Sequence, residues 1–192
     1  LDFTLTFGEP PSLAPDVRII QVEPSPDLIG LSRGVDVAIV GDVGAVVKQM
    51  AQEAESFRWT TPSVFEELED LAKAQVENLE GKADAGLHAM TVHKALRPLL
   101  NEDACVLFEG SDFSFYGTPY YPCLKRSRWF TNGTLGMIGW GVSCGVGAQV
   151  ALPNSKVVVL TGDGAFGFSG LEFDTMVRHG LPIVGVMGNN GI

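Results

Sequence analysis

Residues 161–170 read TGDGAFGFSG and contain the pattern G-x-G-x-x-G at positions 162–167. This pattern is typical of the turn that binds the pyrophosphate of a dinucleotide between a strand and a helix. The residue between the first two glycines is Asp163, whose carboxylate would lie against the phosphates. Two negative groups in one tight turn repel each other unless a cation lies between them. The stretch therefore predicts either a dinucleotide site or a phosphate site bridged by a metal.

The next strand separates these alternatives. A dinucleotide site expects an acidic residue about 20 positions further on to bind the ribose, but here the second strand ends in Gly188, Asn189 and Asn190. A right-handed strand–helix–strand crossover would place Asp163 and Asn190 at one edge of a parallel sheet. A carboxylate and an amide oxygen suit Mg²⁺, which takes its other ligands from phosphates. GDG followed by NN, with Asn190 lying 27 residues after Asp163, favours the metal site.

These motifs resemble the cofactor motif of the thiamine diphosphate-dependent enzymes, in the family of acetolactate synthase, 2-hydroxyacyl-CoA lyase and oxalyl-CoA decarboxylase. The stretch TLGMIGWGVSCGVGAQVA (134–151) looks like the glycine-rich helix start that precedes the motif in the acetolactate synthase branch. The stretch GFSGLEFDTMVRHGLPIV (167–184) is similar to the helix and strand of the two CoA-dependent enzymes. The resemblance covers residues 90–192 closely and residues 1–57 loosely.

The resemblance implies roles for individual residues. Asp163 and Asn190 would bind Mg²⁺ by their side chains, and the backbone carbonyl of Ile192 would be the third protein ligand. The carbonyl of Gly136 would receive the aminopyrimidine, and Ile138 would hold the cofactor in its bent, reactive shape unless it is an ordinary core residue. The residues expected to contact thiamine diphosphate are Asp112, Phe113, Gly136, Met137, Ile138, Gly162, Asp163, Gly164, Ala165, Phe166 and Asn190.

The resemblance assigns no catalytic residue within this chain. In the family, the glutamate that activates the pyrimidine lies in an N-terminal domain and is usually donated by a neighbouring subunit, and no stretch of these 192 residues matches that domain. The chain begins without methionine and stops at NNGI directly after a strand. We therefore expect a piece of a longer protein that forms a homodimer or homotetramer.

Hydrophobic periodicity predicts an α/β chain with doubly wound parallel sheets. Residues 1–57 are interpreted as the C-terminal part of a Rossmann-like central domain, with strands LDFTLTF, VRIIQVE and VDVAIVG and a helix over 43–54. Residues 58–90 are interpreted as a connector that is helical over 64–80. Residues 91–192 are expected to be a diphosphate-binding domain, truncated on its C-terminal side.

The elements predicted for this last domain alternate between strand and helix. A short helix over 91–100 precedes the strand ACVLFEG, which leads into the loop SDFSFYGTPYYP. The glycine-dense stretch then turns helical, and the strand KVVVLTG, a helix over about 168–179 and the strand PIVGVMG follow.

Composition excludes several partners. The 45% hydrophobic and 19% charged residues are typical of a soluble globular protein without a membrane span. A net charge of −10 argues against nucleic acid and anionic membranes. Lys125, Arg126 and Arg128 are either anion contacts or a solvated loop. Three cysteines and three histidines without metal-type spacing indicate packed, reduced thiols, structural or surface histidines and a cytoplasmic location.

We predict a thiamine diphosphate- and Mg²⁺-dependent lyase or ligase that acts on 2-hydroxyacyl-CoA or 2-oxo acid substrates. The first alternative is an acetolactate synthase-type carboligase. The second is a non-catalytic nucleotide-binding module, in which the central domain holds FAD or ADP and Glu23 either meets a ribose or is simply exposed. A Rossmann dehydrogenase is disfavoured by Asp163 and by the missing ribose acid.

Overall fold

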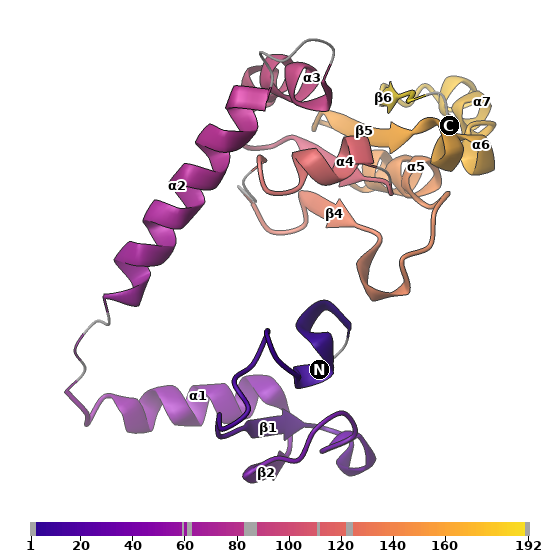
Figure 1. Ribbon diagram of the computed structural model, residues 1–192. Helices are drawn as coiled ribbons and strands as arrows, with labels where there is room; N and C mark the ends of the chain where they lie inside the picture. Colours follow the sequence, from indigo (N-terminus) through magenta and orange to yellow (C-terminus); the bar gives the residue numbers. More distant parts are fainter. Residues whose placement is uncertain are drawn as a thin grey trace. The chain divides into compact units, whose positions relative to one another are not determined.

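The computed structural model describes residues 3–58, 60, 63–82, 88–110, 112–121 and 125–190. The chain divides into two compact units, Leu1–Pro62 and Ser63–Ile192, and each is described by itself (Figure 1). The helix predicted for the connector belongs to the second unit. Among the described residues, no helix combines the length and the apolar character that a membrane span requires.

The first unit is a small parallel α/β element. Strand β1 (Ile20–Glu23) pairs in parallel with β2 (Val37–Val40), and both lie within the predicted strand runs. Helix α1 (Val43–Ala54) has the predicted bounds. It begins at Asp42, whose carboxylate accepts a hydrogen bond of 2.8 Å from the N–H of Ala45 and so satisfies one free donor of the first turn. The 3₁₀ helix η2 (Pro26–Leu28) connects the strands.

The predicted first strand, LDFTLTF, is wrong. The described part of this segment forms a 3₁₀ helix, η1 (Phe3–Gly8). Thr6, Phe7 and Gly8 all have positive φ values, of 48°, 54° and 88°. This left-handed backbone reverses the chain and cannot continue a strand, although the alternation of Leu, Phe and Thr is typical of one.

The second unit is built on a four-stranded sheet with the order β4–β3–β5–β6, in which every pair is parallel. Its described elements are α2 (Val64–Lys82), α3 (Ala89–Leu96), η3 (Arg97–Leu99), β3 (Cys105–Phe108), α4 (Asp112–Gly117), β4 (Trp129–Thr131), η4 (Gly133–Leu135), α5 (Gly141–Ala151), β5 (Val157–Gly162), α6 (Asp163–Ser169), α7 (Glu172–Arg178) and β6 (Val184–Gly188).

Both faces of this sheet are covered, which confirms the predicted doubly wound arrangement. Alternate residues of the fully buried strands β3 and β5 enter two separate hydrophobic clusters. Phe108 and Leu160 face the cluster that contains Met90 of α3 and Phe113 of α4. The opposite face packs against Val142 of α5 and Met176 of α7, with Leu107 and Val159 among the strand residues.

Two predicted segments differ in the structure. The loop predicted for SDFSFYGTPYYP contains helix α4, which buries Phe113, Ser114 and Gly117 on one side. The helix predicted over about 168–179 is two helices, α6 and α7, separated at Gly170 and Leu171. Strand β4 was not predicted, because its three residues are too few to show a period of two.

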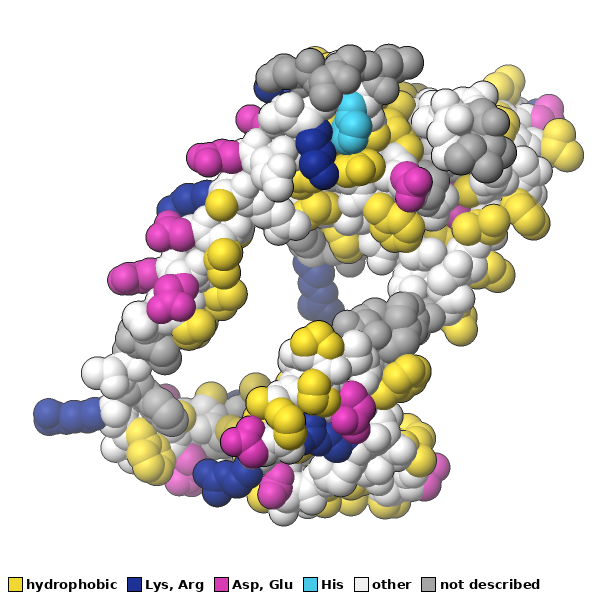
Figure 2. Space-filling model, in the orientation of Figure 1, with side chains coloured by type: hydrophobic (Ala, Val, Ile, Leu, Met, Phe, Trp, Pro, Cys, Tyr) yellow, Lys and Arg dark blue, Asp and Glu magenta, His cyan; other side chains and the backbone are white. Residues whose placement is uncertain are grey.

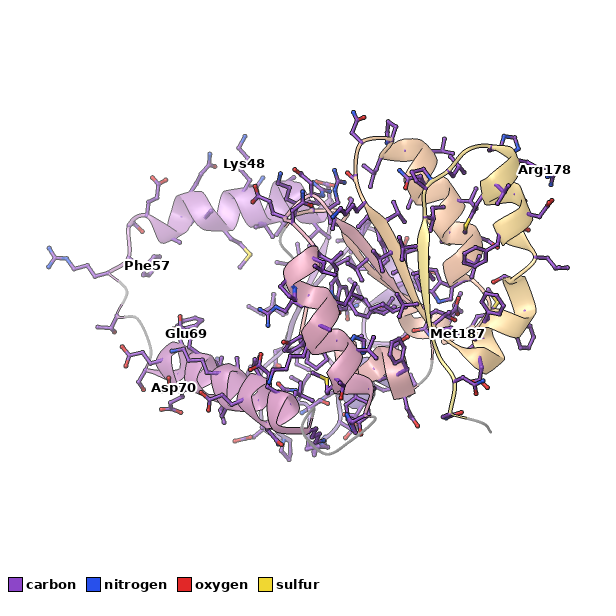
Figure 3. All side chains as sticks on the ribbon, turned by 90° about the horizontal axis from the view of Figure 1, so that it is seen from above. Lys48, Phe57, Glu69, Asp70, Arg178 and Met187 are labelled. Atoms are coloured by element: carbon purple, nitrogen blue, oxygen red, sulfur yellow. The ribbon has the colours of Figure 1, made fainter. Side chains whose placement is uncertain are left out.

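The outer surfaces carry charge as well as apolar side chains. Along α2, Val64, Leu68 and Leu71 are exposed, and Figure 2 shows a row of hydrophobic side chains on this helix. Arg178 lies on the outer side of α7 (Figure 3) and pairs with Asp174 at 2.8 Å. Both side chains of this pair are largely exposed, so the pair adds little stability.

His93 connects α3 to α4 inside the core. Its ring is fully buried and stacks on Phe113 with a centroid distance of 4.7 Å. Its Nε2 lies 2.7 Å from the carbonyl oxygen of Phe113 and its Nδ1 lies 3.3 Å from the hydroxyl of Tyr121. Burial lowers the pKa of His93, the carbonyl of Phe113 raises it less, and the charge of His88 lowers it further.

The lowered pKa of His93 predicts a stability that depends on pH. Below its ordinary value of 6.5, the unfolded chain takes up a proton that the folded chain rejects. We expect the contribution to be complete above pH 6.5 and lost as the pH falls toward the folded pKa, with a slope of at most about 1.4 kcal/mol per pH unit. Urea unfolding at several pH values measures it.

The matched control for this experiment is the exposed His179. The His93→Gln variant should lose part of the slope between neutral and mildly acidic pH, whereas His179→Gln should keep it. An identical slope in wild type and His93→Gln would contradict the assignment to His93.

Candidate functional site

A cavity of about 460 Å³ lies at the carboxyl ends of β5 and β6 in the second unit, and we refer to it as the site cavity. This is the edge at which ligands bind in doubly wound sheets. Its lining residues are His88, Ala89, Val92, Asp112, Phe113, Tyr116, Asp163, Val186, Met187, Gly188, Asn189 and Asn190. Met187, near the end of β6, is among the residues labelled in Figure 3.

The pairing of β5 with β6 brings Asp163 and Asn190 to one cavity. Gly162 is the register partner of Gly188, so the two strands end side by side. Asp163 follows as the first residue of α6, and Asn190 lies two residues beyond the end of β6. The structure thus places the two residues in the arrangement that their sequence spacing indicated.

The first turn of α6 leaves open space above its backbone. Ala165 is buried, and Phe166 packs with its ring centroid 5.7 Å from that of Phe173. A Cβ atom placed on Gly164 would meet no atom within 4 Å. Packing therefore does not require glycine at this position, whereas the close approach of a ligand to the backbone would.

Helix α4 supplies another part of the wall of the site cavity. Asp112, its first residue, lines the site cavity, and Phe113 is 8% exposed. The ring of Phe113 lies directly against the backbone of Gly188, where no side chain would fit. Phe113 is thus a core residue as well as a lining residue, and it fixes the end of β6 from which Asn190 extends.

The predicted pyrimidine contacts belong to residues 136–141, which we call the glycine loop. Gly136 has a φ of 61° and Gly139 a φ of 91°, a left-handed backbone that favours glycine. A methyl carbon of Ile138 lies close to Gly110, the second residue after the end of β3. The Ile138 side chain is 43% exposed and that of Met137 is 63% exposed. This exposure counts against the interpretation of Ile138 as an ordinary core residue.

Glu109 was missed by sequence reasoning. It follows β3 directly, is fully buried, and accepts hydrogen bonds from the N–H groups of Gly139, at 2.8 Å, and Gly141. Burial raises the pKa of Glu109, and the N–H groups of Gly141 and Gly139 lower it by less. The only signal in the sequence was an acidic residue at the end of the apolar run CVLF.

The metal ligands predicted from the sequence are only partly described. Ile192 lies outside the described residues. In the part of the chain that the structure describes, no group of three or more His, Cys, Asp or Glu could hold a metal ion. A site made of one carboxylate, one amide and one backbone carbonyl does not require such a group.

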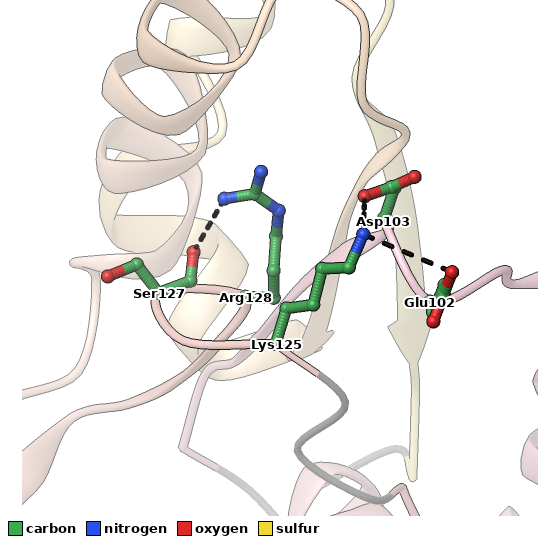
Figure 4. A network of polar contacts seen from close by, with 5 residues as sticks. All are labelled: Glu102, Asp103, Lys125, Ser127 and Arg128. Atoms are coloured by element: carbon green, nitrogen blue, oxygen red, sulfur yellow. Dashed lines mark hydrogen bonds and ion pairs between the residues drawn. The ribbon is translucent and has the colours of Figure 1, made fainter.

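The basic segment of residues 125–128 lies in a polar network on the surface (Figure 4). Lys125 pairs with Asp103 at 2.6 Å and with Glu102 at 4.0 Å, and Arg128 donates to the carbonyl of Ser127 at 3.3 Å. The hydrogen bond with Asp103 raises the pKa of Lys125. For Lys125, this favours the solvated-loop interpretation over an anion contact.

Glu23 ends β1 in the first unit, as predicted. Its carboxylate accepts a hydrogen bond of 3.3 Å from the N–H of Ser25. It also lines a hollow of about 220 Å³ beside Gln21 and Arg33.

Two of the three cysteines lie in described regions. Both are free thiols: Cys105 is buried, as predicted, whereas Cys144 is exposed, so the prediction of a packed thiol is wrong there. Partial desolvation raises the pKa of both. Cys123 lies outside the described residues.

The second unit is thus a parallel α/β domain with a cavity at the carboxyl edge of its sheet. Residues 110–192 match the family model described as "Thiamine pyrophosphate enzyme, C-terminal TPP binding domain". This part of the chain is therefore similar to the cofactor-binding domain of the thiamine pyrophosphate enzymes. The resemblance carried by GDGAF and NN is confirmed.

The relatives of the chain fall into the three groups expected. It is 32% identical over 204 residues to the human 2-hydroxyacyl-CoA lyase 1, an alignment that spans 100% of this chain and 35% of the relative. It is 32% identical over 197 residues to the oxalyl-CoA decarboxylase of Escherichia coli K12, with the same two shares. A probable acetolactate synthase of Mycobacterium bovis is 43% identical over 106 residues, or 55% of this chain and 19% of the relative. The chain thus spans about a fifth to a third of these relatives.

Gly164 provides a test of the site cavity. We expect Gly164→Ala to leave stability unchanged or raised by up to about 1 kcal/mol, since alanine favours the helix. The same methyl group should weaken binding of thiamine diphosphate at least tenfold, because it occupies the space above the backbone. Thermal unfolding and titration calorimetry measure the two effects.

Gly167 is the matched control, because it lies in the same helix and its added Cβ would also meet nothing within 4 Å. Gly167→Ala should keep wild-type cofactor affinity. Equal affinities for Gly164→Ala and Gly167→Ala would show that the first turn of α6 does not approach the ligand.

Proposed function

We propose that this chain is part of a thiamine diphosphate- and Mg²⁺-dependent enzyme that breaks or forms a carbon–carbon bond beside a carbonyl group. Its substrates are of the 2-hydroxyacyl-CoA or 2-oxo acid type. The observation that carries the proposal is that Asp163 and Asn190 line one cavity at the carboxyl edge of the sheet. A carboxylate and an amide oxygen form a donor set for a hard divalent cation.

The described residues fit the cofactor. Asp163 and Asn190 would hold the Mg²⁺ ion, together with the backbone carbonyl of Ile192. The open backbone of Gly164 and the following N–H groups of Ala165 and Phe166 would bind the diphosphate. When bound, thiamine diphosphate would supply the nucleophile that adds to the carbonyl and the electron sink that stabilises the negative charge left on the cleaved fragment. The protein's contribution is to bind, orient and desolvate the reacting groups.

The glycine loop would serve the other end of the cofactor. In this proposal the carbonyl of Gly136 accepts the amino group of the pyrimidine, and the exposed side chain of Ile138 supports the bent shape. The glutamate that activates the pyrimidine would come from outside this chain. An oligomer in which a neighbouring subunit supplies that acid is therefore part of the proposal.

The alignments favour a lyase of acyl-CoA substrates. The relatives named as 2-hydroxyacyl-CoA lyase and oxalyl-CoA decarboxylase align with the whole chain. The alternative, an acetolactate synthase-type carboligase, is supported by the higher identity of a shorter alignment. The second alternative is a non-catalytic nucleotide-binding module with FAD or ADP in the first unit, for which Glu23 at the end of β1 is the candidate contact.

The metal site is tested with Asp163→Ala. Loss of this ligand leaves the charge of the diphosphate partly uncompensated, and we expect the dissociation constant for thiamine diphosphate in the presence of Mg²⁺ to rise at least tenfold, about 1.4 kcal/mol. Titration calorimetry on the full-length protein measures it. The control is Asp174→Ala on the exposed surface of α7, and an unchanged constant for Asp163→Ala would contradict the assignment.

The role of Ile138 is tested by turnover rather than by binding. Ile138→Ala should lower kcat more than it lowers cofactor affinity, because the variant loses the geometry of the bound cofactor rather than its anchoring. Turnover is measured with 2-hydroxyacyl-CoA and 2-oxo acid substrates. Leu135→Ala, which truncates a side chain that is 89% exposed, is the control. Wild-type turnover in Ile138→Ala would support ordinary packing at this position.

A further inference from the structure

Glu109 is a buried acid that the proposed function does not use. Its side chain is fully buried, and its N–H donates at 2.8 Å to the carbonyl of Leu160 in the neighbouring strand β5. The backbone of Glu109 is therefore held in the sheet. A buried carboxylate is costly unless hydrogen-bond donors surround it, so its partners indicate what it does.

Most of those partners are backbone N–H groups of the glycine loop, and the N–H of the adjacent Gly110 also faces the carboxylate. Oε1 accepts from the N–H of Gly139 at 2.8 Å, and Oε2 accepts from the N–H of Gly141. The side chain of Trp140, between them, makes no capping hydrogen bond to α5. Glu109 thus caps α5 from a strand that lies 32 residues earlier in the chain.

Close packing around the glycine loop also explains why positions 139 and 141 are glycine. A Cβ atom on Gly141 would collide with the carboxylate of Glu109, and one on Gly139 would collide with the Cβ of Phe168 in α6. The next residue, Gly110, lies against a methyl carbon of Ile138. The end of β3 therefore holds the glycine loop at two points, by hydrogen bonds through Glu109 and by packing through Gly110.

We propose that Glu109 is a positioning residue that sets the glycine loop in the conformation that receives the pyrimidine end of thiamine diphosphate. This inference rests on the proposed function. The carboxylate form is required, because the loop groups that it contacts are N–H donors. A carboxamide would satisfy one of them and set its NH₂ group against the other.

The experiment compares two ligands in the full-length protein. Titration calorimetry with Mg²⁺ gives the dissociation constants of thiamine diphosphate, which uses both halves of the site, and of inorganic diphosphate, which uses only one. Glu109→Gln should weaken thiamine diphosphate binding at least tenfold and change inorganic diphosphate binding less than twofold. Glu109→Asp keeps the charge and should recover part of the loss.

The matched control is Glu102→Gln, the same chemical change on an exposed glutamate, and it should leave both constants at wild-type values. If Glu109→Gln does not fold, the ratio of the two constants is taken from Glu109→Asp, whose carboxylate falls one methylene short of the loop. An unchanged ratio, or an equal loss of both ligands, overturns the positioning role. Wild-type protein that binds inorganic diphosphate but not thiamine diphosphate overturns the proposed function together with it.

Discussion

The parallel pairing of β5 with β6 is the constraint on which the site depends. The pairing runs in register from Val158↔Val184 to Gly162↔Gly188. Because parallel strands end at the same edge, every residue that follows either strand is delivered to one place. This strand pairing is enough to bring Asp163 and Asn190 together at the site cavity. The ring of Phe113 packs against the backbone of Gly188 and so fixes the end of the edge strand β6.

The glycines of the second unit fall into two groups that the sequence alone does not separate. At Gly145, Gly185 and Gly188 an added Cβ would collide with a side chain of the core, so these positions serve close packing. At Gly136 and Gly164 an added Cβ would meet nothing within 4 Å. Glycine at Gly136 is explained by its positive φ, whereas at Gly164 neither packing nor backbone conformation demands it. Gly167 in the same helix is equally open, so open space alone does not mark the position of a ligand.

Sequence patterns predicted what depends on local periodicity and on strand order. These patterns predicted the buried strands β3 and β5, helix α1, and the position of Asp163 and Asn190 at one edge of the sheet. The sequence patterns failed where a contact with residues far away in the chain determines the local structure. Helix α4 forms within a Pro-, Tyr- and Gly-rich stretch because the core accepts Phe113, and Gly117 lies against the ring of His93. Glu109 could not be found, because its partners lie 30 and 32 residues further along the chain.

The charges around the site cavity supply the physical reason for a cation. Asp112 and Asp163 both line it, and among its described lining residues none is Lys or Arg. His88 also lines the cavity, and its Nδ1 accepts a hydrogen bond of 3.1 Å from the N–H of Met90. The nearby Lys82 does not line the cavity; its ammonium group lies 5.2 Å from the ring centroid of Tyr116. A diphosphate entering this cavity would face two carboxylates in a chain whose net charge is −10. Backbone N–H groups alone would not offset that repulsion, whereas the divalent ion that we propose beside Asp163 would turn it into an attraction. The acid that made the glycine motif unsuitable for a dinucleotide is thus the residue that makes a metal-bridged diphosphate possible.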